Sequence, residues 1–199
     1  MSYMFNNCRS LKSIDLSSLN TLNVNTMRAM FQNCRSLKSI DLSSFDTNKV
    51  TDMSKMFSLC VSLESIDLSS FNTINVNNME AMFANCHSLR TIDLSTFRTK
   101  NVYYMNCMFC LCYSLISIDL SSFDTTKVRS LNSMFSFCRK LESCNLSSFD
   151  TTEVKDLMYM FNGCSALDKK NIIVGEKCKN ILDEFDTPLV SNIFRAIFQ

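Results

Sequence analysis

Apolar residues follow two different patterns along this chain, one after the other. In residues 37–42, LKSIDL, the pattern alternates as in a β-strand, which places Ile40 and Leu42 inward and Ser39 and Asp41 outward. A pair of serines and a phenylalanine follow, and these predict a turn and a return of the chain to the core.

The next stretch has a longer period. Its apolar positions step by three and four residues, which predicts one face of a short helix; in this unit they are Val50, Met53, Met56, Phe57 and Cys60. A threonine precedes each such pattern, and we interpret its hydroxyl as the helix N-cap, with the residue before it (such as Asp46) as the alternative cap. The threonines are Thr21, Thr47, Thr73, Thr99, Thr125 and Thr151.

Both patterns recur every 26 residues. One cysteine column consists of Cys8, Cys34, Cys60, Cys86, Cys112, Cys138 and Cys164. The matching phenylalanine column consists of Phe5, Phe31, Phe57, Phe83, Phe109, Phe135 and Phe161. A fixed period of this length indicates a solenoid, in which stacking buries the apolar face that a single unit cannot bury alone.

The repeat MFxxCxSLxSIDLSSFDTxxVxxM resembles that of BspA-like leucine-rich-repeat surface proteins, in the variant with a 26-residue Phe-Asp-Thr unit. The resemblance covers residues 4–164 and, weakly, residues 185–198. The predicted fold is therefore an α/β leucine-rich-repeat-type solenoid of about seven 26-residue strand–turn–helix units plus a degenerate C-terminal unit. The resemblance implies a binding scaffold at a microbial cell surface, with a role in adhesion, and it supplies no catalytic residues.

Two regions are predicted. Residues 1–164 form the solenoid, and residues 165–199 form a divergent last repeat and a C-terminal cap. Within the cap, residues 185–198 repeat the helical pattern, with Pro188 at the first helical position, where a missing N–H costs nothing. At the other end, the first strand around Ile14 lacks an upstream partner, so we expect either a longer array or self-association through this uncapped edge.

Charge excludes some partners. The 20 basic and 19 acidic residues nearly cancel, and one column mixes charges of both signs, so we expect no nucleic-acid partner. The column consists of Lys12, Lys38, Glu64, Arg90, Ile116 and Glu142. No apolar run is long enough to cross a bilayer, so no membrane insertion is expected. The start of the chain lacks the features of a secretory signal peptide. The lack of a signal peptide and the free cysteines favour an intracellular location, whereas the family resemblance favours the cell surface.

The chain has 11 cysteines. Neighbours in the cysteine column should lie one strand spacing apart, about 4.8 Å. A disulfide prefers Cβ atoms about 3.5–4.5 Å apart, so we predict a stack of buried, reduced thiols.

Two further cysteines, Cys107 and Cys110, break the repeat at outer-face positions, so we expect them to be exposed on one helix. A zinc ion needs four ligands, and the adjoining units cannot complete the set, so no metal site is predicted. The residues that they offer are Ala81, Ala84, Ser133 and Ser136.

No catalytic constellation stands out. The only histidine is His87, and every serine and aspartate that could act beside it belongs to a repeating column. Catalytic residues are expected to break the repeat rather than follow it, so we predict no enzyme activity and no cofactor.

The candidate binding residues lie mostly on the outward side of the strands. An aspartate column consists of Asp15, Asp41, Asp67, Asp93 and Asp119. A serine column beside it consists of Ser17, Ser43, Ser69, Ser95 and Ser121. At about 4.8 Å, adjacent carboxylates repel by roughly 0.9 kcal/mol in water, which requires an offset. Either serine hydroxyls supply it by hydrogen bonding, or the row binds cations, meaning Ca²⁺ or the Lys and Arg side chains of a partner.

A second candidate is a group of apolar and aromatic residues in one unit: Tyr103, Tyr104, Tyr113 and Ile116. Exposed aromatic residues favour interfaces, although scattered surface tyrosines are the simpler interpretation. We therefore predict a non-enzymatic scaffold whose strand-lined face binds a protein partner of unknown identity. The alternative is a structural element that stacks end to end within a longer array.

Overall fold

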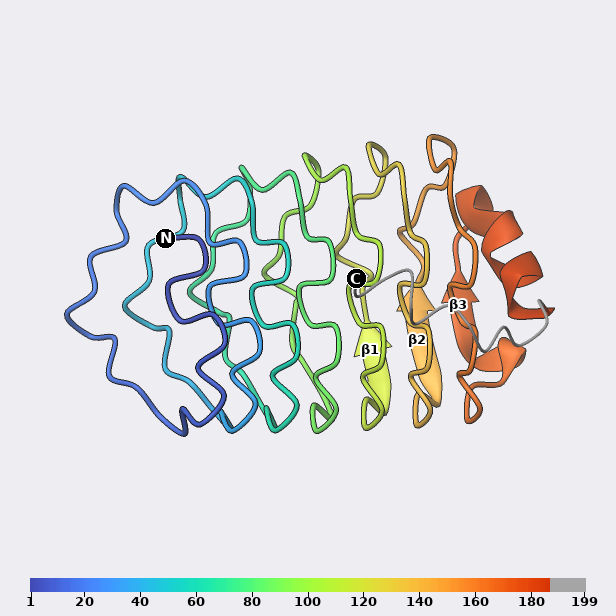
Figure 1. Ribbon diagram of the computed structural model, residues 1–199. Coiled ribbons are helices and arrows are strands. Elements are labelled where there is room, and N and C mark those ends of the chain that lie inside the picture. Colours follow the sequence, from blue (N-terminus) through green and yellow to red (C-terminus); the bar gives the residue numbers. More distant parts are fainter. Residues whose placement is uncertain (187–199) are drawn as a thin grey trace.

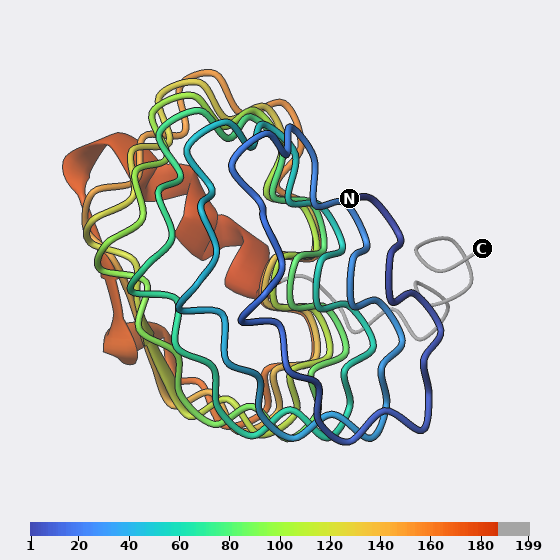
Figure 2. The ribbon, with the colours of Figure 1, turned by 90° about the vertical axis from the view of Figure 1, so that its left-hand side faces the viewer.

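The protein is a stack of similar coils. The computed structural model describes residues 1–186, which wind side by side from the N-terminal to the C-terminal end (Figure 1). Seen end-on, successive coils follow nearly the same path around a common interior (Figure 2). Phe57 stacks on Phe83, one period away, with ring centroids 5.7 Å apart and planes 7° apart. The predicted repeat solenoid is thus confirmed.

Regular strands occur only toward the C-terminal end of the described residues. The strands β1 (Ser117–Asp119), β2 (Ser143–Leu146) and β3 (Ile172–Val174) form a parallel sheet in the order β1-β2-β3. Two 3₁₀ segments, η1 (Lys169–Asn171) and η2 (Glu176–Asp186), lie at the same end (Figure 1). The corresponding segments of the earlier coils follow the same course without regular strand pairing.

We call the outer side of these segments the strand face. It comprises residues 11–17, 37–43, 63–69, 89–95, 115–121 and 141–147. The predicted alternation is confirmed, because Leu42 is buried and Ile40 packs against the core, while Ser39 and Asp41 are exposed. The strand face therefore presents polar side chains to solvent.

The opposite side of each coil, which we call the turn face, differs from the prediction. It comprises residues 26–34, 52–60, 78–86, 104–112 and 130–138. No helix forms here, and the chain runs instead through consecutive tight turns. The N–H of Phe31 donates to the carbonyl of Met56 in the next coil at 2.9 Å, and the N–H of Gln32 donates back to the carbonyl of Ala29 at 3.2 Å. Along the turn face, one N–H thus bonds to the next coil and the N–H of the following residue bonds within the same turn.

Backbone conformation explains why a helix is excluded. Ala29 and Asn33 have φ of 53° and 63°, and the corresponding residues of the other coils also lie in the left-handed region. A right-handed helix cannot contain such residues, and a helix would direct its N–H groups along its own axis rather than to the next coil. Turns closed between residues i and i+3 bury apolar side chains with a period close to that of a helix, so the hydrophobic pattern did not distinguish the two.

The threonine column does not cap helices. Instead, the Thr73 hydroxyl accepts the N–H of Arg98 at 2.7 Å and donates to the carbonyl of the same residue at 3.2 Å. Thr21, Thr47, Thr99 and Thr125 repeat this arrangement. The N-cap interpretation is wrong, and each buried hydroxyl joins one coil to the next.

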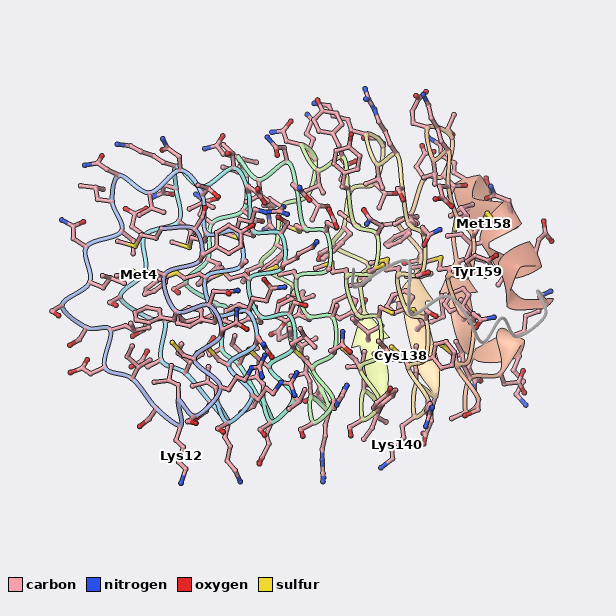
Figure 3. All side chains as sticks on the ribbon, viewed as in Figure 1. Met4, Lys12, Cys138, Lys140, Met158 and Tyr159 are labelled. Carbon is pink, nitrogen blue, oxygen red and sulfur yellow. The ribbon has the colours of Figure 1, made fainter. Side chains whose placement is uncertain are left out.

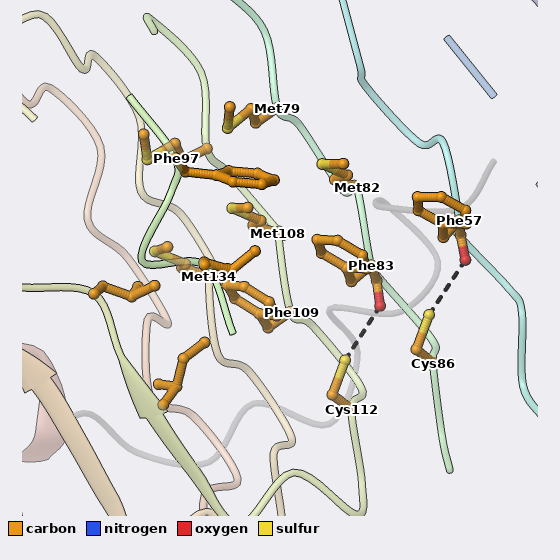
Figure 4. Close-up of a cluster of buried hydrophobic side chains, with 14 of the residues drawn as sticks. Phe57, Met79, Met82, Phe83, Cys86, Phe97, Met108, Phe109, Cys112 and Met134 are labelled. Carbon is orange, nitrogen blue, oxygen red and sulfur yellow. Dashed lines mark hydrogen bonds between the residues drawn. The ribbon is translucent and has the colours of Figure 1, made fainter. Parts of the chain in front are cut away.

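The core consists of stacked columns. Figure 4 shows Phe57, Phe83 and Phe109 beside a group of methionines. The Cys86 thiol donates to the carbonyl of Phe57 at 3.2 Å, and the Cys112 thiol donates to the carbonyl of Phe83 at 3.2 Å. Six of the seven column cysteines are buried, as predicted, whereas Cys8 is exposed. Each buried thiol also satisfies a carbonyl that the stack encloses.

The prediction for the two additional cysteines is wrong. Cys107 and Cys110 are 4% and 1% exposed, because this column of the turn face lies under neighbouring side chains. They belong to a second, smaller apolar cluster with Ala81, Ala84, Leu111 and Phe137. The sequence pattern placed them outward because it assumed a helix.

The structure describes only part of the C-terminal region for which the sequence predicted a last repeat and a cap. β3 continues the sheet, and η2 follows it, whereas most of the predicted helix over residues 185–198, including Pro188, lies outside the described residues. Within residues 1–186, no helix has the length and apolar character needed to cross a bilayer.

Candidate binding surface on the strand face

The aspartate column has the same local geometry in all five coils. In each, the carboxylate accepts the N–H of the serine two residues later at 2.9 Å, as Asp41 does from Ser43. This hydrogen bond closes a small turn at the end of each strand segment. The column and its serines are exposed, so the structure places both predicted sets together on the strand face.

Hydrogen bonding offsets the repulsion within the row. The pKa of Asp41 and Asp67 is lowered from its ordinary value, first by the backbone N–H of the following serine and then by its hydroxyl. Neighbouring carboxylates act in the opposite direction and have a smaller effect on Asp67. The serine donors predicted from the sequence are present, but the backbone contributes more than the hydroxyl.

The charge itself is not needed for this turn. Asn145 occupies the next position of the column, and its side-chain oxygen accepts the N–H of Ser147 at 3.1 Å. An amide therefore makes the same hydrogen bond as the five carboxylates. The negative charge is left available to solvent or to a ligand.

The aspartate row has no cationic ion-pair partner in the part of the chain that the structure describes. Among residues 1–186, none of the five aspartates forms an ion pair, whereas Lys38 and Glu64 on the same face lie 3.2 Å apart. Small hollows lie between successive coils, one of about 60 Å³ between Asp41 and Asp67 and one of about 70 Å³ between Asp15 and Asp41. These are far below the roughly 300–1,000 Å³ typical of small-molecule sites.

The predicted aromatic group is not one patch. Tyr104 is 43% exposed on the turn face and Ile116 is 39% exposed on the strand face. Tyr103 lies under the guanidinium of Arg129, 5.2 Å from the ring centroid. Tyr113 is half-buried at the edge between the two faces. The four residues are therefore separated by the coil, and this candidate is weaker than the aspartate row.

Sequence reasoning missed a basic edge beside the strand face. Tyr113 stacks on His87 with centroids 4.5 Å apart, and the guanidinium of Arg139 lies 4.8 Å from the Tyr113 centroid. Lys12 and Lys140 extend from the lower edge of the stack (Figure 3). Arg9 and Arg35 occupy the same repeat position as Arg139, one residue after a column cysteine. The signal was in the sequence, since Arg9, Arg35 and Arg139 share one column.

The only histidine has no catalytic surroundings. Burial and the nearby charge of Arg35 lower the pKa of His87, and its Nε2 atom has no hydrogen-bond partner among the described residues. Its ring contacts Tyr113 rather than a carboxylate or a nucleophile. In the part of the chain that the structure describes, no group of three or more His, Cys, Asp or Glu side chains is arranged to hold a metal ion.

The repeat solenoid is similar in fold to leucine-rich-repeat proteins. A crystal structure of a leucine-rich-repeat protein from T. pallidum matches with a TM-score of 0.55 and 21% identity, over 86% of this chain and 72% of that chain. A leucine-rich-repeat protein from Bacteroides ovatus matches with a TM-score of 0.37 and 19% identity, over 92% and 68% of the two chains. The first likeness shows the fold.

The family is shown by sequence. The chain belongs to the family described as "Mycoplasma protein of unknown function, DUF285", whose model matches residues 1–110 and 85–187. No curated protein matches the chain. Together with the structural likeness, the family match supports the predicted BspA-like leucine-rich-repeat relationship at the level of the family. The fold and the family match support a repeat scaffold.

Proposed function

We propose that the protein is a non-enzymatic scaffold that binds a protein partner through its strand face, with the aspartate row receiving Lys and Arg side chains. Adhesion at a cell surface is one form of such binding, in line with the repeat that this chain resembles. The observation that carries the proposal is a row of five exposed carboxylates without ion-pair partners among residues 1–186.

The hollows along the row favour side chains over metabolites as ligands. At about 60 Å³, the space between Asp41 and Asp67 accommodates the tip of a lysine or an arginine rather than a whole small molecule. A partner with several basic residues at matching intervals would contact several coils at once. Multiple contacts of this kind raise the affinity without requiring any single strong ion pair.

The test removes charge and keeps shape. Replacing Asp41, Asp67 and Asp93 by Asn retains the oxygen that accepts the serine N–H, as Asn145 already does. We expect the triple variant to be at least as stable as the parent and to bind an oligolysine peptide more weakly at low salt. Thermal unfolding and fluorescence anisotropy measure the two effects, and a titration with CaCl₂ shows whether Ca²⁺ competes.

A matched control removes three carboxylates elsewhere. Asp46, Asp52 and Asp124 accept the N–H two residues later in the same way, but lie off the strand face. The corresponding triple Asn variant should retain peptide binding. Equal losses in both variants would show a general charge effect, and unfolding of the strand-face variant would show that its carboxylates are structural. Either result removes the aspartate row from the binding surface.

A specific observation also favours the alternative of end-to-end assembly. In the first coil, the N–H groups of Tyr3 and Phe5 donate to the second coil at 2.9 and 2.8 Å. The carbonyls of Ser2, Met4 and Asn6, which point the other way, receive no N–H donor from the described residues. Tyr3 and Met4 are about half exposed beside them. This edge suits the stacking of a coil from another copy.

Light scattering of the 199-residue chain over a range of concentrations tests assembly. Assembly predicts a mass that grows with concentration and falls when Met4 is replaced by Lys. A constant monomer mass excludes self-association through this edge and leaves the strand-face proposal unaffected.

A further inference from the structure

Two cysteines of the turn face differ from all the others in their surroundings. Cys107 and Cys110 lie in the small apolar cluster outside the main core, with Leu111 and Phe137 in the cluster and Tyr113 packed against it. The column cysteines each donate to a backbone carbonyl of the preceding coil, as Cys112 does to Phe83. Cys107 and Cys110 instead lie together in this cluster.

The backbone holds this pair at a distance suited to a disulfide. Cys107 has φ of 58°, and the N–H of Cys110 donates to the carbonyl of Cys107 at 3.0 Å, which closes a turn between the two residues. Such a turn brings its end Cα atoms within about 7 Å. Disulfides span Cα distances of about 4.4–6.8 Å, so the bond can form without rearranging the coil.

The same positions of the neighbouring coils hold no thiol. The equivalent residues one period away are Ala81 and Ala84 on one side, and Ser133 and Ser136 on the other. Within residues 1–186, two cysteines occupy both ends of one hydrogen-bonded turn of the turn face only here.

We propose that Cys107 and Cys110 form a redox-active dithiol site, which small-molecule disulfides convert to an intramolecular disulfide by thiol–disulfide exchange. The site lies in a cluster separate from the main core, with partly buried Tyr113 packed against it, so we expect local opening beside Tyr113 to give access. The site is independent of the strand face and of the function proposed for it.

The exchange proceeds in two balanced steps. Cys107, as the thiolate, attacks one sulfur of the small disulfide, which breaks the S–S bond and releases one small thiolate. Cys110 then gives its proton to solvent and attacks the Cys107 sulfur, which releases the second small thiolate. Two protein thiols are oxidised, one small disulfide is reduced to two thiols, and the released thiolates take up the protons.

The order of attack follows from the surroundings of the two thiols. Cys107 is the less buried of the two, at 4% against 1% exposed, and the nearby Cys107 side chain together with burial raises the pKa of the Cys110 thiol. We therefore expect Cys107 to react first. Replacing Cys110 by Ser should consequently trap the small thiol on Cys107 as a mixed disulfide.

The experiment uses the full chain with Cys8→Ser, since Cys8 is the exposed thiol. The protein is incubated with oxidised glutathione, alkylated, and analysed by mass spectrometry. Apart from the alkyl groups added, we expect the oxidised protein to be lighter than the reduced protein by two hydrogen atoms. This change should appear at a concentration of oxidised glutathione about tenfold below that which modifies any column cysteine. Cleavage after Phe109 leaves Cys107 and Cys110 in separate peptides that only the disulfide joins.

Three variants in the Cys8→Ser background assign the bond. Cys107→Ser should abolish the disulfide, Cys110→Ser should retain one glutathione on Cys107, and Cys112→Ser should behave as the parent.

In urea the preference for Cys107 and Cys110 over the other cysteines should disappear, because all thiols become accessible. The proposal is wrong if no disulfide forms in the folded parent, if glutathione remains attached to Cys107 there, or if the bond joins other cysteines. Unchanged selectivity in urea would also overturn it, because sequence proximity alone would then explain the bond.

Discussion

The turn face and the strand face are built from the same coils but are held together differently. On the turn face, N–H groups such as those of Ala29 and Phe31 bond directly to the next coil, and the aromatic column stacks beneath them. On the strand face, regular pairing is confined to β1, β2 and β3, and earlier coils share isolated bonds such as Glu64 N–H to the Lys38 carbonyl at 3.0 Å. Coil-to-coil stability therefore depends mainly on the turn face and core, which leaves the outward strand positions open to a binding role.

The largest expected effect is in the core behind the turn face. Phe83→Ala should cost about 3–5 kcal/mol, because it removes a fully buried ring between Phe57 and Phe109. It should also uncouple the coils on either side, since each contacts only its neighbours. Urea unfolding followed by circular dichroism should show an earlier, broadened or split transition.

The strand face supplies the comparison for that variant. Ile116 is partly exposed, so Ile116→Ala should change the unfolding free energy much less. A single, unshifted transition for Phe83→Ala would contradict the expected coupling between coils.

Loss of one inter-coil threonine should have the next largest effect. Thr73→Val keeps the shape but leaves the N–H and carbonyl of Arg98 without the hydroxyl, at a cost of about 1–3 kcal/mol. Thr91→Val, at an exposed strand-face position, is the matched control and should lie within about 0.5 kcal/mol of the parent. Equal midpoints for the two variants in urea would show that the hydroxyl does not join the coils.

A smaller effect is expected where the turn face requires a special backbone. Gly163 has φ of 75°, and an added Cβ would lie 2.7 Å from the Phe137 ring. Gly163→Ala should cost about 1–2 kcal/mol from the left-handed conformation alone, plus the displacement of that ring. Combining it with Phe137→Leu should recover part of the loss, measured as the thermal midpoint relative to Phe137→Leu alone. If the Phe137→Leu background restores none of the lost stability, the cost of Gly163→Ala comes from the backbone conformation alone.

The smallest effect on stability is expected from acid, through protonation of a single hydrogen-bonded carboxylate. The pKa of Asp150 is lowered to about 2, first by hydrogen bonds from Thr152 and then by Lys177. Because the folded pKa is lowered, the stabilisation is complete above the ordinary aspartate pKa of about 3.9 and is lost as pH falls toward 2. Carboxyl NMR titration should give Asp150 a lower midpoint than Asp41, whose pKa is also lowered. An ordinary midpoint for Asp150 would contradict the predicted hydrogen bonds.

The contrast between the two faces also explains which predictions from sequence succeeded. The strand face followed from alternation, because outward Asp41 and inward Leu42 differ in polarity whatever the strand pairing. The turn face did not, because Met53, Met56 and Phe57 would be buried by a helix and by a series of turns alike. A better signal was the column of Asn7, Asn33, Asn85 and Gly163, residues that tolerate positive φ and disfavour helix interiors.

The site was predictable to a similar extent. The column period placed Asp41 and Ser43 beside each other, but it could not show that a backbone N–H is the main donor. The sequence placed Cys107 and Cys110 near each other, but the helical assumption put them at the surface, whereas the turn buries them in the smaller apolar cluster. The stack of Tyr113 on His87 involves rotamers and neighbouring coils, which a pattern of residue types does not specify.

The direction of the turn-face hydrogen bonds gives the stack a polarity. From Phe5 to Met30 and from Phe31 to Met56, the N–H of one coil points toward the next coil along the chain, and the carbonyls point back. Within the turn face these peptide dipoles add in one direction and place carbonyl oxygens at its leading edge, whereas the N–H groups of Thr51 and Glu64 donate backward to the preceding coil. Two copies related by a twofold axis through the turn-face edge would bring oxygen against oxygen there, which is repulsive. We therefore expect assembly through this edge to join unlike ends, and such a contact gives a ring where its rotation closes and an open filament where it does not.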